Sequence, residues 1–168
     1  MTFETPRLLL RPFQQGDLDD LFEYGSQPGV GRMAGWRPYA TIGDARHALE
    51  KNRSNPNIFA LVYRKTGKVV GHIAIHEDSE NGRDDTKELG FALNESYQRR
   101  GLMSEAVSLV LEHLSSIGVR KVWACCFQEN LPSKRLIEKC GFAFMQEGTY
   151  YSPSLNQTFL SFEYVYTF

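Results

Sequence analysis

The segment Gln98-Arg99-Arg100-Gly101-Leu102-Met103-Ser104 places a glycine and two arginines directly before a run with helical spacing. The first turn of a helix offers free backbone N–H groups and the positive end of the helix dipole, which together attract an anion. Gly101 allows close approach of the backbone, and Arg99 and Arg100 can donate charge-assisted hydrogen bonds. The segment therefore fits a diphosphate, although a solvated arginine pair before an ordinary helix explains it about equally well.

Residues 97–106 resemble the pyrophosphate loop of GNAT superfamily N-acetyltransferases, whose pattern is Gln/Arg-x-x-Gly-x-Gly/Ala. Gln98 and Gly101 match this pattern, whereas Met103 replaces the usual small third residue. Met103 also falls on the apolar stripe of the following helix, which predicts a core side chain. The segment is neither a Walker P-loop nor a Gly-x-Gly-x-x-Gly dinucleotide motif.

A second stretch, residues 130–142 (NLPSKRLIEKCGF), is similar to an Asn-x-x-Ser motif followed by Glu-Lys-x-Gly-Phe. This pattern resembles the GNAT branch that contains the ribosomal-protein N-terminal (alanine/serine) acetyltransferases. Residues 5–12 (TPRLLLRP) and 88–93 (ELGFAL) resemble the same branch, so the likeness extends over nearly the whole chain. Several motifs in the expected order are far more specific than one.

The resemblance implies an N-acetyltransferase that moves an acetyl group from acetyl-CoA, its cosubstrate, to a primary amine by direct transfer in a ternary complex. The acceptor is either a protein N-terminal α-amine or a small-molecule amine, and the sequence does not choose between them. A non-catalytic acyl-CoA-binding or sensing domain is the alternative function. The resemblance also implies that coenzyme A contacts Phe91, Ala92, Leu93, Gln98, Arg99, Arg100, Gly101, Leu102, Met103, Ser104, Asn130 and Ser133.

Proton transfer in such a reaction indicates two catalytic candidates. An amine with a pKa of about 10 must lose a proton before it can attack, and Glu88 begins the strand that the resemblance assigns to the pantetheine arm. An exposed carboxylate at a strand end explains Glu88 about as well. Ser133 is placed by the resemblance near the departing sulfur, where it could protonate the thiolate. Asn130 is equally a helix N-cap, and Ile137 occupies the position where the superfamily often has a tyrosine acid.

Two features could contact the acceptor. The family likeness places Trp36, Arg37 and Tyr39 near the acceptor, which suits a flat or peptide-like molecule. The stretch 77–87 contains five acidic residues that could attract a cation, although a solvated surface loop is the favoured explanation. These five are Glu77, Asp78, Glu80, Asp84 and Asp85.

Hydrophobic periodicity predicts an α/β (α+β) fold in which these residues lie at strand and helix ends. The resemblance implies a GNAT-like single domain with a roughly seven-stranded, mostly antiparallel sheet, about four helices, and strands 88–94 and 119–127 splayed apart for acetyl-CoA. Strands are expected at 5–13, 58–64, 68–76, 88–94, 119–127, 142–151 and 159–167, and helices from residue 17 and at 42–53, 102–117 and 132–140.

Length and composition restrict the remaining possibilities. The 168 residues fit one domain spanning 1–168, and a net charge of −1 argues against nucleic acid as a partner. No stretch reaches the roughly 20 apolar residues of a membrane helix, and the start of the chain lacks the layout of a secretory signal. Three cysteines, two of them adjacent, predict reduced thiols and a cytoplasmic location. The four histidines show no metal-ligand spacing, so no metal is expected, and the chain is expected to be a monomer or homodimer.

Overall fold

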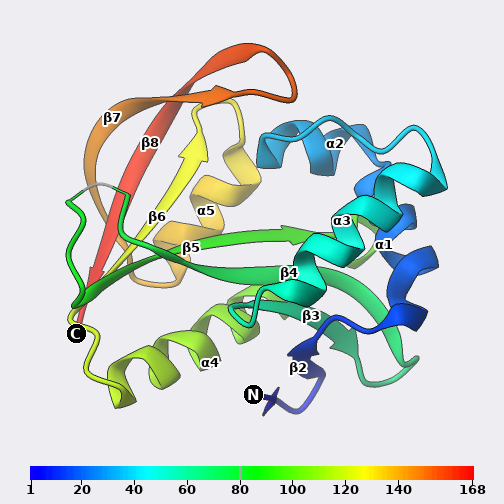
Figure 1. Cartoon of the computed structure of the whole chain (residues 1–168). Helices are drawn as coiled ribbons and strands as arrows, with labels where there is room; N and C mark the ends of the chain where they lie inside the picture. The colour runs from blue at the N-terminus through cyan, green and yellow to red at the C-terminus, as the bar shows by residue number, and fades with distance from the viewer. Residues whose placement is uncertain (80) are drawn as a thin grey trace.

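The computed structural model describes residues 1–79 and 81–168, which form a mixed eight-stranded sheet with helices on both faces (Figure 1). The strands lie in the order β1-β2-β3-β4-β5-β6-β8-β7. They are β1 (Phe3–Glu4), β2 (Leu8–Pro12), β3 (Ile58–Tyr63), β4 (Lys68–Glu77), β5 (Thr86–Leu93), β6 (Lys121–Phe127), β7 (Ala143–Ser152) and β8 (Gln157–Thr167). The α-helices are α1 (Leu18–Gly25), α2 (Pro28–Gly31), α3 (Ile42–Ser54), α4 (Leu102–Ser116) and α5 (Leu131–Lys139).

Two apolar clusters on opposite faces of the sheet hold the helices in place. The larger cluster joins the buried stripe of α4, including Ala106, Val110 and Leu114, to alternate residues of the central strands. The smaller cluster joins Leu21 of α1 and Leu49 of α3 to the opposite face. The predicted stripe on α4 is confirmed, and the helix ends before a left-handed glycine at position 118 with φ 87°.

The sheet divides between β5 and β6. These two strands are the parallel pair, and their register runs only from Thr86–Lys121 to Leu89–Ala124. On its other edge β5 stays paired with β4 as far as Leu93. Beyond Leu89 the chain of β5 therefore separates from β6, as the resemblance implied, and the carboxyl end of a parallel pair is a usual place for a ligand.

The predicted fold class is confirmed, but the expected numbers of strands and helices are too low. Residues Phe3–Glu4 pair back onto Leu9–Leu10 and add an eighth strand. The fifth helix is α2, a single turn that begins with Pro28 and lies within a Gly- and Pro-rich stretch for which no helix was expected. Such short elements depend on tertiary contacts because one helical turn has almost no intrinsic stability.

The acidic stretch before β5 is largely occupied by internal interactions. Glu77 pairs with Lys87 at 2.6 Å, and Asp85 pairs with Arg83 at 2.8 Å. Asp78 is buried and accepts hydrogen bonds from the hydroxyl of Thr86 and the backbone of Asn81. Glu80 lies outside the described residues. In the described part of the chain, no helix is long and apolar enough to span a membrane.

Candidate active site

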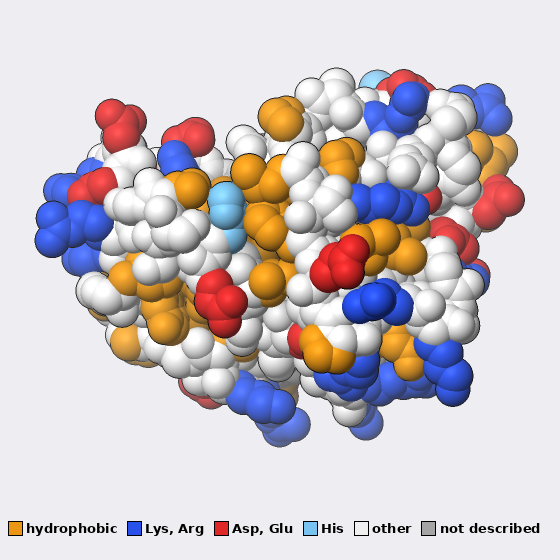
Figure 2. Space-filling view, turned by 90° about the horizontal axis from the view of Figure 1, so that it is seen from below, with side chains coloured by type: hydrophobic (Ala, Val, Ile, Leu, Met, Phe, Trp, Pro, Cys, Tyr) orange, Lys and Arg blue, Asp and Glu red, His pale blue; other side chains and the backbone are white. Residues whose placement is uncertain are grey.

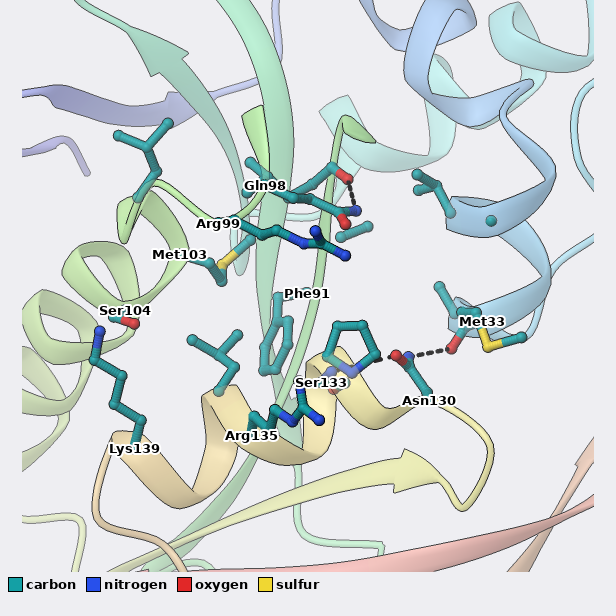
Figure 3. A pocket seen from close by; sticks show the side chains of 18 of the residues that line it. Met33, Phe91, Gln98, Arg99, Met103, Ser104, Asn130, Ser133, Arg135 and Lys139 are labelled. Carbon is teal, nitrogen blue, oxygen red and sulfur yellow. Dashed lines mark hydrogen bonds between the residues drawn. The ribbon is translucent and has the colours of Figure 1, made fainter. Parts of the chain in front are cut away.

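A cavity of about 680 Å³ occupies the gap between the separated strands and the first turns of α4 and α5 (Figure 3). All the predicted coenzyme-binding residues except Arg100 line it. Other lining residues come from α2 and its continuation, and from α5. The complete lining comprises Gly29, Val30, Met33, Ala34, Phe91, Ala92, Leu93, Gln98, Arg99, Gly101, Leu102, Met103, Ser104, Glu129, Asn130, Pro132, Ser133, Arg135, Leu136 and Lys139.

The main chain of β5 directs polar groups into this gap. The N–H of Asn94 donates to Val70 of β4 at 2.8 Å, and successive residues of a strand direct their N–H and C=O groups to opposite edges. Phe91 and Leu93 therefore direct their N–H and C=O groups toward the β6 side, beyond the last pair of β5 with β6. The carbonyl of Leu93 accepts the side-chain amide of Gln98 at 2.9 Å. The amide groups of Phe91 remain available to a ligand.

The loop before α4 has the conformation of an anion-binding turn. Gly101 is left-handed with φ 76°, and Arg99, which is not a glycine, is also left-handed with φ 60°. Left-handed residues that alternate with right-handed ones turn successive backbone N–H groups toward one point. A left-handed arginine is sparsely populated, so the surrounding contacts must hold the loop in place.

Positive charge gathers around the cavity. Arg99 extends across it from the loop, Arg135 comes from α5, and Lys139 points toward Ser104 of α4 (Figure 3). Glu129 is the single carboxylate among the lining residues. Three cations against one anion favour a ligand with several negative charges. Arg100 instead places its guanidinium 5.2 Å from the ring of Tyr97.

The sequence motifs did not single out Arg135 and Lys139 of α5, or the lining residues of α2 and the turn that follows it. Arg135 and Lys139 share a helix face with Pro132 and Leu136 because these positions follow the i, i+3, i+4, i+7 spacing. That spacing could have identified them once Ser133 was singled out. No local pattern predicts the position of Met33, which reaches the cavity only because α2 packs against the sheet.

Asn130 caps α5, which is one of the two roles that the sequence left open, and its contact with coenzyme A stays a prediction. Its Oδ1 accepts the N–H of Ser133 at 3.2 Å, which caps α5, and its Nδ2 donates to the carbonyl of Met33 at 3.3 Å. The second bond connects α5 to the segment after α2 across the cavity. Because the cap uses the backbone of Ser133, its hydroxyl is not needed for the helix end.

Several other predicted site residues do not line the cavity. Glu88 is half-buried on β5, and its carboxylate accepts the hydroxyl of Ser79 at 2.6 Å. Trp36 and Tyr39 stack with ring centroids 6.5 Å apart against the smaller core cluster. Arg37 is exposed and donates its backbone N–H to Ser154.

Burial also determines the protonation of several nearby groups. It raises the pKa of Tyr39 to about 12 and lowers the pKa of His72 to about 4. It raises the pKa of the Cys126 thiol to about 11 and, less strongly, the pKa of Cys140. These free thiols are protonated near neutral pH, which makes them poor nucleophiles. Among residues 1–79 and 81–168, no cluster of three His, Cys, Asp or Glu side chains could hold a metal ion.

Surface charge gives no sign of a nucleic-acid interface on the face seen in Figure 2. Acidic side chains and hydrophobic patches lie between the Lys and Arg side chains there, and no continuous basic stripe crosses this face.

Comparisons with known proteins agree with the fold. Residues 7–143 match the model of the acetyltransferase (GNAT) domain. The chain is 31% identical over 143 residues to the uncharacterised N-acetyltransferase YnaD of Bacillus subtilis, covering 84% of this chain and 82% of YnaD. A crystal structure of a GNAT family acetyltransferase from Bacillus anthracis is 27% identical, with a TM-score of 0.84 and coverage of 99% and 98% of the two chains.

A more distant structure shares the fold alone. The microcin C7 self-immunity acetyltransferase MccE, in complex with acetyl-CoA and AMP, is 17% identical with a TM-score of 0.81, over 98% of this chain and 94% of that one. The family match covers most of the chain and coincides with a cavity where two sheet strands separate. The chain therefore belongs to the GNAT acetyltransferase family.

Proposed function

We propose that this protein transfers an acetyl group from acetyl-CoA to a primary amine, directly and within a ternary complex. The observation that carries the proposal is the free main chain of Phe91, which faces a cavity bordered by the left-handed Gly101 turn and three cations. A preorganised N–H directed at the thioester carbonyl would stabilise the negative charge that develops on its oxygen.

The described residues fit coenzyme A along the length of the cavity. The turn at Gly101 and the first turn of α4 suit its diphosphate, and Arg135 and Lys139 on α5 provide further positive charge. The free edge of β5 suits the amides of the pantetheine arm, which can add hydrogen bonds as another strand would. MccE, which shares this fold, was solved in complex with acetyl-CoA and AMP, and this supports the proposal.

Two proton transfers remain for side chains. Ser133 lies at the start of α5 on the cavity wall, where its hydroxyl can donate a proton to the departing thiolate. A thiol has a pKa of roughly 8.5, so the thiolate is a tolerable leaving group and this help is modest. Glu88 contributes to deprotonation of the amine on the side of the sheet that faces α1 and α3.

The acceptor approaches from the face of the sheet that α2 covers. Trp36, Arg37 and Tyr39 border this approach, and the buried indole N–H of Trp36 has no hydrogen-bond partner among the described residues. The amine belongs either to a protein N-terminus or to a small molecule. The three cysteines form no disulfide, which fits a cytoplasmic location.

One experiment separates an enzyme from a non-catalytic acyl-CoA sensor. Calorimetry with acetyl-CoA is combined with thiol release in the presence of peptides that begin with Ser or Ala, and of aliphatic polyamines. Acceptor-dependent thiol release with intersecting initial-velocity lines is the expected result. Tight binding without release for any acceptor would favour the sensor, and mass spectrometry of the products identifies the acetylated amine.

A further inference from the structure

The imidazole of His76 lies over Gly90, at the point where the sheet divides. On the face toward α1 and α3, β4 presents His72, Ala74 and His76, opposite Ala92, Gly90 and Glu88 of β5. A Cβ atom added to Gly90 would be only 3.1 Å from Nε2 of His76. The ring therefore occupies the space above this glycine.

Gly90 has a special place in β5. It is the first residue beyond the last pair with β6, Leu89–Ala124, and it precedes Phe91, whose main chain faces the gap. The turn at Gly101, which suits the diphosphate, lies at the other end of this stretch, next to Leu93 and Gln98. A pantetheine arm that follows β5 away from the turn places its thioester near Phe91 and Gly90. His76 lies beside that point, on the face of the sheet from which the acceptor approaches.

Other ionisable groups on this face are less well placed to receive a proton. The carboxylate of Glu88 is turned toward Ser79. His72 is bonded to the hydroxyl of Tyr24 at 2.9 Å, and burial keeps its pKa near 4, so it is a very weak base. Asp78 is buried against Thr86. From β6 the residue beside Glu88 is Trp123, which carries no charge.

The exposed side chain of His76 differs from all of these, because solvent can carry a proton away from it. Imidazole exchanges protons near neutral pH, which suits a general base. Glu88 is its direct cross-strand partner, at the close spacing typical of such pairs. A carboxylate at that position stabilises an imidazolium.

We propose that His76 accepts the proton from the acceptor's ammonium group, and that Glu88 acts through His76 as a positioning and charge-stabilising residue. The inference rests on the proposed function. The ammonium N–H bond breaks and its proton passes to the imidazole, after which the neutral amine attacks the thioester carbonyl. The C–N bond forms, the C–S bond breaks, and the nitrogen loses its second proton. The thiolate takes a proton from Ser133 or water, and the second proton from the nitrogen replaces the one that Ser133 or water gave up. The imidazolium returns the first proton to solvent.

The test uses the first peptide or polyamine that gives thiol release with the wild-type protein. His76→Gln removes the base and keeps a polar side chain, and general-base help is typically worth about 100- to 10,000-fold. We expect kcat to fall by about 100-fold or more and the basic-going rise of the pH profile to disappear, with unchanged acetyl-CoA affinity. Glu88→Gln should lose less, because the imidazole remains in place.

Two further variants make the result specific. His47→Gln alters an exposed histidine on α3, away from the gap, and should keep the wild-type rate and profile. His76→Ala should regain activity when free imidazole is added, which a merely structural role would not allow.

A folded His76→Gln protein with wild-type kcat and pH profile would overturn the role of His76 and leave the proposed function intact. A loss confined to the acceptor KM would overturn it too. If the wild-type protein itself binds acetyl-CoA but releases no thiol with any acceptor, the proposed function fails and the role of His76 falls with it.

Discussion

Arg7 and Glu105 connect the start of β2 to the first turn of α4. The Nε of Arg7 donates to Oε2 of Glu105 at 2.7 Å, and the backbone N–H of Arg7 donates to Oε1 at 3.1 Å. The Nη1 of Arg7 also donates to the carbonyl of Arg100 at 2.8 Å, within the predicted diphosphate loop. Arg7, more than ninety residues earlier in the chain, thus helps to hold the loop that contains the left-handed Arg99.

Glu105→Gln should destabilise the fold near neutral pH and loosen the loop. Burial alone would raise the pKa of Glu105, but hydrogen bonds from Thr5 and Arg7 outweigh it and lower the pKa below the ordinary 4.5. A carboxyl group whose pKa is lower in the folded protein than in the unfolded chain stabilises the fold at pH values above the unfolded-state pKa. This stabilisation is lost as the pH falls through the folded-state pKa. We expect a loss of about 1–3 kcal/mol near neutrality. In urea unfolding, the difference from wild type should vanish below the folded-state pKa, and a constant difference would contradict this account.

Gly101→Val should weaken acetyl-CoA binding by about tenfold or more, equivalent to roughly 1.4 kcal/mol. A β-branched residue resists φ 76°, and the turn that directs the backbone N–H groups would reorganise. Gly67→Val is the matched control, since Gly67 has φ 71° in the turn between β3 and β4, with open space around it. Both variants carry the same kind of strain. Calorimetry should find lost affinity only for Gly101→Val, and equal affinity in both would refute the loop assignment.

Replacing Arg135 and Lys139 with glutamine should reduce affinity for coenzyme A by roughly tenfold for each cation, and should make binding less sensitive to salt. The two side chains face the cavity from one side of α5. Lys51→Gln, on the exposed surface of α3, removes the same charge elsewhere. Titrations at low and high salt check this prediction. If Lys51→Gln reduced the affinity for coenzyme A as much as the α5 variants do, only the net charge of the protein would matter.

Ser133→Ala should lower kcat by less than about 100-fold and leave acetyl-CoA affinity almost unchanged. The hydroxyl is removed, but the helix cap survives because Asn130 accepts the backbone N–H of residue 133. The comparison is with Asn130→Ala, which should lose about 1 kcal/mol of stability with the cap. Steady-state kinetics and thermal melts distinguish the two, and an unaltered kcat in Ser133→Ala would exclude the proton-donor role.

His72→Phe should make the protein less sensitive to mild acid. Burial first, and then the charge of His76, keep the pKa of His72 at about 4, below the ordinary 6.5. Between these values the unfolded chain binds a proton that the folded protein does not, so wild-type stability falls as pH decreases. Melting temperatures from neutrality down to about pH 4.5 should therefore drop less in the variant. His47→Gln should retain the wild-type dependence.

Elements with local signals could be predicted from the sequence alone. The apolar period of residues 102–117 predicted α4, and Gln98, Gly101, Asn130 and Ser133 were found from motifs at its start and at the start of α5. These signals work because helix period, caps and left-handed glycines depend on residues a few positions apart. The separated pair of strands followed from the family resemblance.

Contacts across strands and between layers could be found only in the folded structure. The register of β4 on β5 places His76 over Gly90, and the packing of α2 brings Met33 to the cavity. The sheet also has β8 between β6 and β7, and the order of the strands along the chain does not reveal this arrangement. Such relations join residues far apart in the chain. They depend on which strands pair, in which register and where pairing stops, and no local pattern contains that information.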